Sequence, residues 1–317
     1  MSELLHTQPS TISPTARPVA VAFEHVTKQY GDTVALHDVS IQIPIGQTVA
    51  LLGPNGAGKS TSINLTLGLL DPTGGSVRTL GLRPREAIAT GRVGALLQTS
   101  GLPVTARVGE LVAFVRRLYP EPLAMQAILA RSGLKDLERR PVETLSGGEA
   151  QRLRFAMAIA GDPELVFLDE PTVGMDVETR RAFWRDIRAF VAEGRTVLFA
   201  THYLDEADDA AERIVVLDHG RVVADGSARS IKARVSDRVV GFTLPTASPE
   251  VVAAIKAIPG VSGVDVAGER LAVATKDADA VIEQLFARGL RIRDLEIQGA
   301  GLEDAFIALT SSADPAA

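Results

Sequence analysis

Short, continuous apolar runs recur along the chain, and longer stretches with apolar residues at helical spacing separate them. Such short runs are typical of strands that are buried on both faces of a parallel sheet. The alternation predicts an α/β fold with a mixed, largely parallel sheet flanked by helices. The predicted buried strands span residues 49–52, 93–97, 165–168, 197–200 and 214–217.

Two further regions of the first 235 residues have patterns of their own. Residues 21–49 form short strands around turns at 30–32 and 44–46, a β-rich opening that would shelter a bound base. Residues 105–140 form a helical stretch that is broken by prolines near residue 120. The apolar stripe of this stretch is predicted to face the core. Its residues are Leu111, Phe114, Val115 and Leu118.

Beyond residue 236 the pattern changes to strand, helix, two strands around Gly268, helix and strand, followed by a last helix. This β-α-β-β-α-β order is that of a small ferredoxin-like unit. The unit has no group of acids, histidines or glycines with catalytic spacing, so we interpret it as an accessory or regulatory domain. The predicted division is a flexible tail over 1–18, a large domain over 19–235 and a small α+β domain over 236–317.

A glycine-rich string, GPNGAGKS, follows the apolar run 49–52 and precedes a helical segment. The glycines let consecutive backbone N–H groups turn toward one centre, where the helix N-terminus adds partial positive charge. Lys59 can reach the outer phosphates of a nucleoside triphosphate, and Ser60 can bind Mg²⁺. The predicted nucleotide-binding residues are Gly53, Pro54, Asn55, Gly56, Ala57, Gly58, Lys59, Ser60 and Thr61.

Two acids, Asp169 and Glu170, follow the apolar run 165–168. This is the strand end at which ligands bind in open α/β sheets. Asp169 is predicted to hold Mg²⁺ through water, and Glu170 to orient and deprotonate the water that attacks the γ-phosphate. Acids after a strand also form solvated turns, but the phosphate loop in the same chain favours the catalytic interpretation.

The string LSGGEAQR at 145–152 contains a capping box, Ser146 to Glu149, that opens an amphipathic segment. A helix start alone does not explain Gly147 and Gly148, because glycine destabilises a helix unless another group must approach its backbone closely. A helix N-terminus without side chains is a second phosphate site. Since the chain has one phosphate loop, we expect a head-to-tail dimer in which Ser146 and Gly148 meet the ATP of the other subunit.

Together these strings, over roughly residues 21–235, resemble the ATP-binding subunit of an ABC transporter, for which LSGGE is nearly diagnostic. The resemblance implies a P-loop NTPase fold with a helical subdomain, and ATPase activity that requires Mg²⁺. Residues 19–235 would be the nucleotide-binding domain. The signature residues that would act in trans are Ser146, Gly147, Gly148 and Glu149.

The resemblance also implies roles for four residues outside the longest strings. Gln98 would be a magnesium ligand that links the attacking water to the membrane partner, and His202 would contact the γ-phosphate. Asp176 would cross the dimer interface, although Met175 stands where the family more often has leucine. Tyr30 would stack on adenine.

Several of these residues have plainer interpretations. Tyr30 could cap a hairpin turn, and a lone histidine after a strand, such as His202, is commonly a structural hydrogen-bonding residue. Four acids follow His202 closely, and we predict that they form the solvated start of a helix, where negative charge meets the positive end of the dipole. These acids are Asp205, Glu206, Asp208 and Asp209.

The implied partners are transmembrane permease subunits and a second nucleotide-binding subunit, in a homodimer or a heterodimer. The resemblance places the chain peripherally at the cytoplasmic face of the cell membrane. The segment LEDAFIALT at 302–310 resembles the tail of drug-resistance and lipid-exporter subunits. We therefore expect export of drugs or lipids, with the substrate specified by the membrane subunit.

Composition limits the alternatives. The chain has no cysteine, which excludes disulfides and thiolate metal sites, and its net charge of −6 argues against nucleic acid bound at a basic surface. No apolar run approaches the roughly 18 residues that cross a bilayer, so we expect another polypeptide to form the channel. The main alternative is a soluble ABC ATPase that acts as a mechanical switch in DNA repair or translation. The short interval between Lys59 and Ser146 argues against the repair members, and the single phosphate loop against the translation members.

Overall fold

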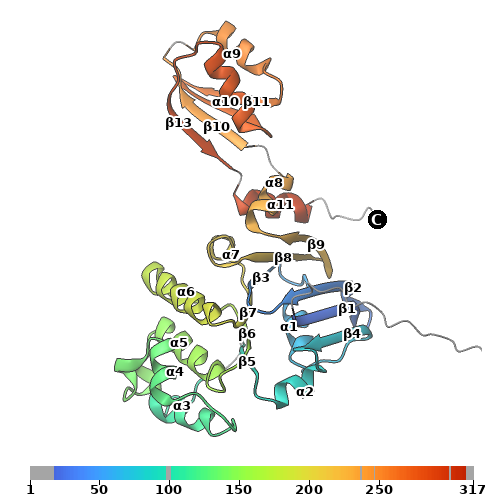
Figure 1. Ribbon diagram of the computed structural model, residues 1–317, viewed down its shortest axis with the longest axis vertical. Helices are drawn as coiled ribbons and strands as arrows, with labels where there is room; N and C mark the ends of the chain where they lie inside the picture. Colours follow the sequence, from blue (N-terminus) through green and yellow to red (C-terminus); the bar gives the residue numbers. More distant parts are fainter. Residues whose placement is uncertain (1–17, 98–100, 236–237, 246, 300, 312–317) are drawn as a thin grey trace, which may run out of the picture.

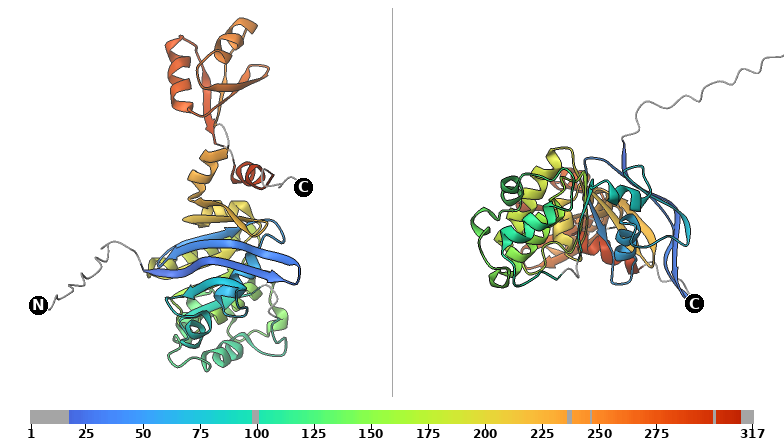
Figure 2. Two further views of the ribbon diagram at one scale, coloured as in Figure 1. Left: turned by 90° about the vertical axis from the view of Figure 1, so that its right-hand side faces the viewer. Right: turned by 90° about the horizontal axis from the view of Figure 1, so that it is seen from below.

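The computed structural model describes residues 18–311 apart from 98–100, 236–237, 246 and 300. Within these residues the strands form three sheets. Figures 1 and 2 show an elongated molecule, in which a small body containing α9 and α10 stands at one end of a larger body. Helices α8 and α11 lie between the two bodies in both side views.

The largest sheet carries the predicted motifs and has the strand order β5-β6-β7-β3-β8-β9. Among its described pairs, only β8 with β9 is antiparallel. All residues of β3 and β7 are buried because both faces of the sheet are covered. The predicted, largely parallel sheet is therefore confirmed. Its strands are β3 (Thr48–Leu52), β5 (Val93–Leu96), β6 (Leu165–Asp169), β7 (Thr196–Ala200), β8 (Arg213–Asp218) and β9 (Arg221–Gly226).

A second, antiparallel sheet with the order β2-β1-β4 covers one face of the central sheet, and α1 packs in the same layer. Val49 and Leu51 of β3 share a buried cluster there with Ile63 of α1 and Phe23 of β1. Side chains alternate along a strand, so the residues between them face the opposite side. The elements of this layer are β1 (Val19–Tyr30), β2 (Thr33–Pro44), β4 (Gly74–Thr79) and α1 (Lys59–Thr66).

Helices cover the opposite face, where Ala50 and Leu52 of β3 belong to a second buried cluster. The cluster is rich in aromatic residues, and the rings of Phe155 and Phe183 meet edge to face with centroids 5.4 Å apart. Its main helices are α3 (Val108–Arg116), α4 (Met125–Arg131), α5 (Gly147–Ala158), α6 (Val177–Ala192) and α7 (Leu204–Ala210). Shorter pieces of this layer are the 3₁₀ turns η1 (Lys135–Leu137) and η2 (Val142–Thr144), whereas α2 (Pro84–Ala89) packs through Ala87 in the cluster of the first face.

The apolar stripe that was predicted to face the core lies in α3 and the turn after it, and only half of its residues pack against the core. Leu111 is buried and Val115 packs against the helical cluster. Phe114 and Leu118, however, are 60% and 68% exposed. The prediction is wrong at these two positions, because α3 lies at the edge of the molecule and has no second layer above it.

The small body contains a four-stranded antiparallel sheet with the order β11-β12-β10-β13. A separate buried cluster, which includes Phe242 of β10, Ile255 of α9 and Leu285 of α10, holds it together. The element order is the predicted β-α-β-β-α-β, while the ferredoxin-like assignment stays a prediction. The elements are β10 (Arg238–Thr243), α9 (Pro249–Lys256), β11 (Val261–Ala267), β12 (Arg270–Thr275), α10 (Ala278–Ala287) and β13 (Arg293–Gln298).

The last helix, α11 (Leu302–Ser311), does not belong to the small body. Its Leu302 and Ala305 are buried in the helical cluster of the large domain, together with Ile231 of α8 (Ala228–Val235). The structure thus differs from the predicted division at residue 236, because α11 returns to the large domain after the small body is complete. The small body is an insertion between α8 and α11.

Candidate nucleotide site

The phosphate loop joins β3 to α1, and its glycines fit where no side chain could. A Cβ at Gly53 would lie 2.3 Å from the backbone oxygen of Leu217, and one at Gly58 would lie 2.6 Å from Cδ2 of Leu36. Gly58 also has a φ of 105°, which L-residues with a side chain rarely adopt. The backbone of the loop is therefore closely packed at both glycines. The loop leads directly into α1, which begins at Lys59.

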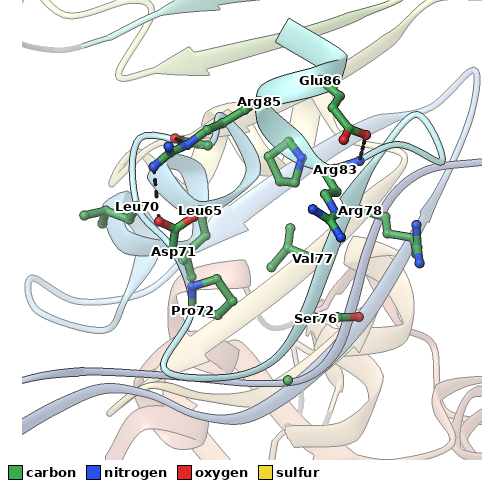
Figure 3. Close-up of a pocket in the computed structure, with 13 residues that line it drawn as sticks. Leu65, Leu70, Asp71, Pro72, Ser76, Val77, Arg78, Arg83, Arg85 and Glu86 are labelled. Carbon is green, nitrogen blue, oxygen red and sulfur yellow. Dashed lines mark hydrogen bonds and ion pairs between the residues drawn. The ribbon is translucent and has the colours of Figure 1, made fainter.

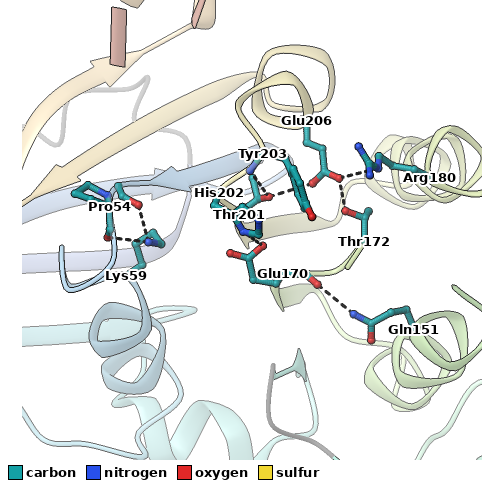
Figure 4. Close-up of polar contacts among 11 residues, drawn as sticks. Pro54, Lys59, Gln151, Glu170, Thr172, Arg180, Thr201, His202, Tyr203 and Glu206 are labelled. Carbon is teal, nitrogen blue, oxygen red and sulfur yellow. Dashed lines mark hydrogen bonds and ion pairs between the residues drawn. The ribbon is translucent and has the colours of Figure 1, made fainter. Parts of the chain in front are cut away.

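Lys59 is the first residue of α1, directly after this loop (Figure 4). Its Nζ donates hydrogen bonds to the backbone oxygens of Gly53, at 2.6 Å, and Pro54, at 3.0 Å. Burial lowers the pKa of the Lys59 ammonium, while the nearby carboxylates of Glu170 and Asp169 act in the opposite direction. The predicted phosphate-binding cation thus lies beside both predicted acids.

The two acids occupy the carboxyl end of β6. Burial, followed by the charge of Glu170, raises the pKa of Asp169, and the Lys59 cation opposes this change. Glu170 has a left-handed φ of 50°, and its N–H donates to the backbone oxygen of Ala200 on β7 at 2.9 Å. Its own carbonyl accepts a hydrogen bond from Nε2 of Gln151 at 3.1 Å. Such backbone strain in a non-glycine residue persists only where its surroundings fix it.

The structure brings His202 and Glu170 into direct contact, which the sequence analysis did not predict. Nδ1 of His202 lies 2.9 Å from Oε2 of Glu170, and the histidine side chain is more than half exposed. The phosphate loop, Thr201, His202 and Phe306 of α11 line a cavity of about 230 Å³. The loop, the histidine and the last helix therefore share one hollow.

The predicted capping box at the start of α5 is confirmed. Oγ of Ser146 accepts from the Glu149 N–H at 3.2 Å, and the Glu149 carboxylate accepts from the Ser146 N–H at 2.7 Å. The bond from the Ser146 backbone is the main cause that lowers the pKa of Glu149, and Arg140 contributes in the same direction. A Cβ at Gly147 would lie 3.2 Å from the backbone oxygen of Gly174, so this glycine also serves packing within the chain.

The bodies of the two helices whose first turns are predicted to bind phosphate lie on opposite sides of the central sheet. Ile63 and Leu65 of α1 pack in the cluster on one face, and Leu153 and Phe155 of α5 pack in the cluster on the other. Figure 1 shows the same separation, with α1 and α5 on either side of the strands. Within one subunit the sheet therefore stands between the bodies of the two helices.

Tyr30 and Asp176 lie at the ends of secondary-structure elements. Tyr30 ends β1 with 45% of its surface exposed, and Nζ of Lys28 lies 5.2 Å from its ring centroid. Asp176 is the N-cap of α6 and accepts from the Thr179 N–H at 2.8 Å. Its role at a dimer interface stays a prediction. Gln98 lies outside the described residues.

Comparison with known proteins identifies the family. The family model described as ABC transporter matches residues 36–173. The Nod factor export ATP-binding protein I of Sinorhizobium fredii is 35% identical over 313 residues, which is 95% of this chain and 89% of that protein. The daunorubicin/doxorubicin resistance ATP-binding protein DrrA of Streptomyces peucetius is 32% identical, with 92% of each chain covered. The chain belongs to the ABC transporter family.

Solved structures of ABC proteins share its large domain. An ATP-binding subunit of an ABC transporter has a TM-score of 0.61 at 25% identity, covering 68% of this chain and 92% of that one. An ATP-binding cassette in a dimeric post-hydrolysis state with ADP and Pi has a TM-score of 0.59 at 25% identity, covering 65% and 98%. The predictions of an ABC ATP-binding subunit and of ATPase activity are confirmed by these relatives. In the described part of the chain, no helix has the length and apolar character to span a bilayer.

The ABC site has the donors that Mg²⁺ requires. The hydroxyl of Ser60 at the exposed start of α1 and the carboxylate of Asp169 are hard oxygen ligands. Mg²⁺ is usually held by one or two such groups with nucleotide phosphates and water, rather than by a protein cage. Among the described residues, no three acids or histidines gather as such a cage. When bound, Mg²⁺ would neutralise charge that develops on the β- and γ-phosphates.

A larger cavity of about 600 Å³ lies elsewhere on this ABC subunit, between the end of α1, β4 and α2 (Figure 3). Three arginines line it, and NH2 of Arg85 forms an ion pair with Asp71 at 3.1 Å. The other two arginines are Arg78 and Arg83. The cavity contains none of the predicted nucleotide-binding residues, so it is separate from the candidate nucleotide site.

Sequence reasoning missed three residues of the site. Gln151 lies two residues after Glu149, and its place in the string LSGGEAQR was the sequence signal for its buried side chain, which bonds to the Glu170 carbonyl. Phe306 gave no signal, since only the return of α11 brings it to the phosphate loop. Glu206 was predicted to be solvated, but it is 3% exposed, and this prediction is wrong.

Proposed function

We propose that this ABC ATPase works as a head-to-tail dimer in which each ATP lies between the phosphate loop of one subunit and Ser146 to Gly148 of the other. The placement of α1 and α5 on opposite faces of one sheet carries the proposal, because the sheet then separates the two helices within one subunit. The dimeric cassette structures among the relatives support it.

The residues of the site suggest a division of work. The Lys59 ammonium supplies positive charge to the outer phosphates, and the backbone around Gly58 lets them approach α1. Glu170 takes the proton of the attacking water, since its carboxylate lies at the strand end beside Asp169. His202 lies 2.9 Å from that carboxylate and so holds it in place while facing the γ-phosphate position. Tyr30 stacks on adenine, and Gln98 links the water to the membrane partner.

The partner is a membrane permease, and the cargo is exported. Exposed Phe114 in α3 and Leu118 in the turn after it lie four residues apart and form an apolar surface on the helical subdomain that suits a permease contact. Export is supported by relatives that are named for Nod factor export and for drug resistance. Binding to the permease would hold the subunit at the cytoplasmic face of the membrane.

The shared site is tested by mixing two inactive variants. Lys59→Ala disables the phosphate loop, and Ser146→Arg disables the signature. If the parts act in trans, each mixed dimer has one intact site. Random mixing should then restore about a quarter of the wild-type ATPase rate, because half of the dimers are mixed.

The matched control mixes Lys59→Ala with Glu170→Gln, which change the same half of the site. Both sites of that mixed dimer stay defective, so no activity should return. Equal recovery in both mixtures, or none in the first while heterodimers form by native mass spectrometry, would contradict the head-to-tail arrangement. If ATPase activity requires a second, different nucleotide-binding subunit, the functional dimer is a heterodimer and not a homodimer.

A further inference from the structure

Glu206 stands out among the acids of α7 because it is the one fully buried carboxylate of this helix. Its side chain is 2% exposed, whereas Asp205 and Asp209 on the same helix are exposed. Burial raises the pKa of Glu206, and its hydrogen-bond donors oppose this change. A buried carboxylate is costly to retain where an apolar side chain could fill the same space. Its position therefore calls for a role besides packing.

The partners of Glu206 come from three separate segments (Figure 4). One carboxylate oxygen, Oε1, accepts a hydrogen bond from the Thr172 hydroxyl and lies 3.3 Å from Nε of Arg180 on α6. The other oxygen, Oε2, accepts from the Thr201 hydroxyl at 3.2 Å. The same Thr201 oxygen accepts from the Tyr203 N–H at 3.0 Å.

These partners connect the two loops that carry the proposed chemistry. Thr172 lies two residues after Glu170, and Thr201 lies directly before His202. One buried carboxylate thus joins the loop after β6 to the loop after β7, and the 2.9 Å contact between Glu170 and His202 depends on how these loops lie.

A second set of contacts connects Glu206 to His202. The guanidinium of Arg180, which pairs with Glu206, lies 5.0 Å from the ring centroid of Tyr203. The Tyr203 ring lies 4.1 Å from the His202 ring. Both routes end at the side chains that face the γ-phosphate position, and neither includes the phosphate loop.

We infer that Glu206 is a positioning residue for ATP hydrolysis, which ties the Glu170 loop to the His202 loop and sets the distance between their side chains. The inference rests on the proposed roles of Glu170 and His202. Because Glu206 bonds to neither Lys59 nor the loop around it, its removal affects the hydrolysis step and leaves nucleotide binding in place.

The test replaces Glu206 by glutamine, which keeps the size of the side chain but removes its charge and one acceptor oxygen. The kcat should fall about tenfold or more, the loss expected when charged hydrogen bonds are removed, while the KM for ATP stays within about twofold. The matched control Asp209→Asn changes an exposed acid of the same helix and should leave both constants unchanged.

A double-mutant cycle separates positioning from general stability. Thr172→Val removes one donor to Glu206 and should lower kcat on its own. Combined with Glu206→Gln it should cost less than the product of the two losses, because both changes break the same connection. Thermal melts show that each variant is folded before its rate is compared.

Three results would overturn the inference: an unchanged kcat in folded Glu206→Gln, a loss confined to the KM for ATP, or multiplicative losses in the double variant. Glu170→Gln is measured in parallel. If Glu170→Gln retains full activity, the proposed function itself fails. If Glu170→Gln is inactive while Glu206→Gln is normal, the inference about Glu206 alone fails.

Discussion

At the scale of single residues, the site is defined by charges held close together at the ends of three neighbouring strands. The loop after β3 supplies Lys59, the end of β6 supplies Asp169 and Glu170, and the loop after β7 supplies His202. Burial lowers the pKa of Lys59 and raises the pKa of Asp169, and the attraction between these two groups opposes both changes. The proposed roles give binding and hydrolysis to different side chains, so single substitutions can separate the two steps.

Glu170→Gln should keep ATP binding and lower hydrolysis about a hundredfold or more, because the amide cannot accept the proton of water. ATP titration followed by phosphate release measures both quantities, and gel filtration should detect an ATP-bound dimer. Glu178→Gln, an exposed residue in the first turn of α6, is the matched control. Wild-type turnover in Glu170→Gln would remove this residue from the mechanism.

Tyr30→Ala should raise the KM for ATP by between several-fold and about a hundredfold, equal to roughly 1–3 kcal/mol of lost stacking on the base. Tyr30→Phe keeps the ring and should bind ATP normally, and comparing the two variants in an ATPase titration isolates the ring from the hydroxyl. An equal loss in both variants would point to the hydroxyl group and refute stacking.

The positions of some site residues could be predicted from the sequence, and those of others could not. Lys59, Ser60, Asp169 and Glu170 are positioned by their immediate neighbours, because a loop or strand end sets their backbone directly. Glu206 could not be placed in this way. An acid in the first turn of a helix is ordinarily stable in water, and only partners that are distant in sequence, such as Thr172, reveal its burial.

At the scale of elements, the helical subdomain combines one buried and one exposed apolar surface. The strands of the central sheet were predictable because continuous apolar runs have few other uses. The exposed part of α3 was not, since helical spacing shows that residues share a face without showing what covers it. Phe114 and Leu118 share an exposed surface, which is consistent with a contact to another protein.

Phe114→Ser together with Leu118→Ser should leave the ATPase rate of the isolated subunit unchanged and weaken its binding to the permease about tenfold or more. Co-sedimentation with vesicles that contain the co-expressed partner permease measures the change. Phe286→Ser is the matched control, because Phe286 is similarly exposed but lies on α10 of the small body. Equal binding by the double variant and the wild type would exclude this surface as the contact.

At the scale of the whole molecule, two domains are connected in an unusual order. The chain leaves the large domain after α8, builds the small body and returns through α11. The sequence predicted both sets of elements but not the return, because an apolar helix at the end of a chain fits either domain equally well. The boundary depends on the contact between α8 and α11, which sequence periodicity does not contain.

Two deletions distinguish the insertion from a simple tail. Replacing residues 238–298 by a flexible linker of about six residues should leave a folded subunit that binds ATP normally, because α11 still reaches α8. Ending the chain at residue 235 should lower the melting temperature by about 5–10 °C, since it uncovers the surface that Leu302 and Ala305 bury. Calorimetry and ATP titration measure both. Equal melting temperatures would show that α11 contributes nothing to the large domain.

The return of α11 to the large domain has a consequence for folding during synthesis on the ribosome. Synthesis proceeds from the N-terminus, and domains generally fold as units in that order. Here the first domain can fold but lacks one part of its core, because the helix that completes this core leaves the ribosome after the whole small body has been made. Until then Ile231 and its neighbours remain uncovered. A nascent chain of this ATPase therefore cannot complete its phosphate-loop cavity before almost every described residue has been translated.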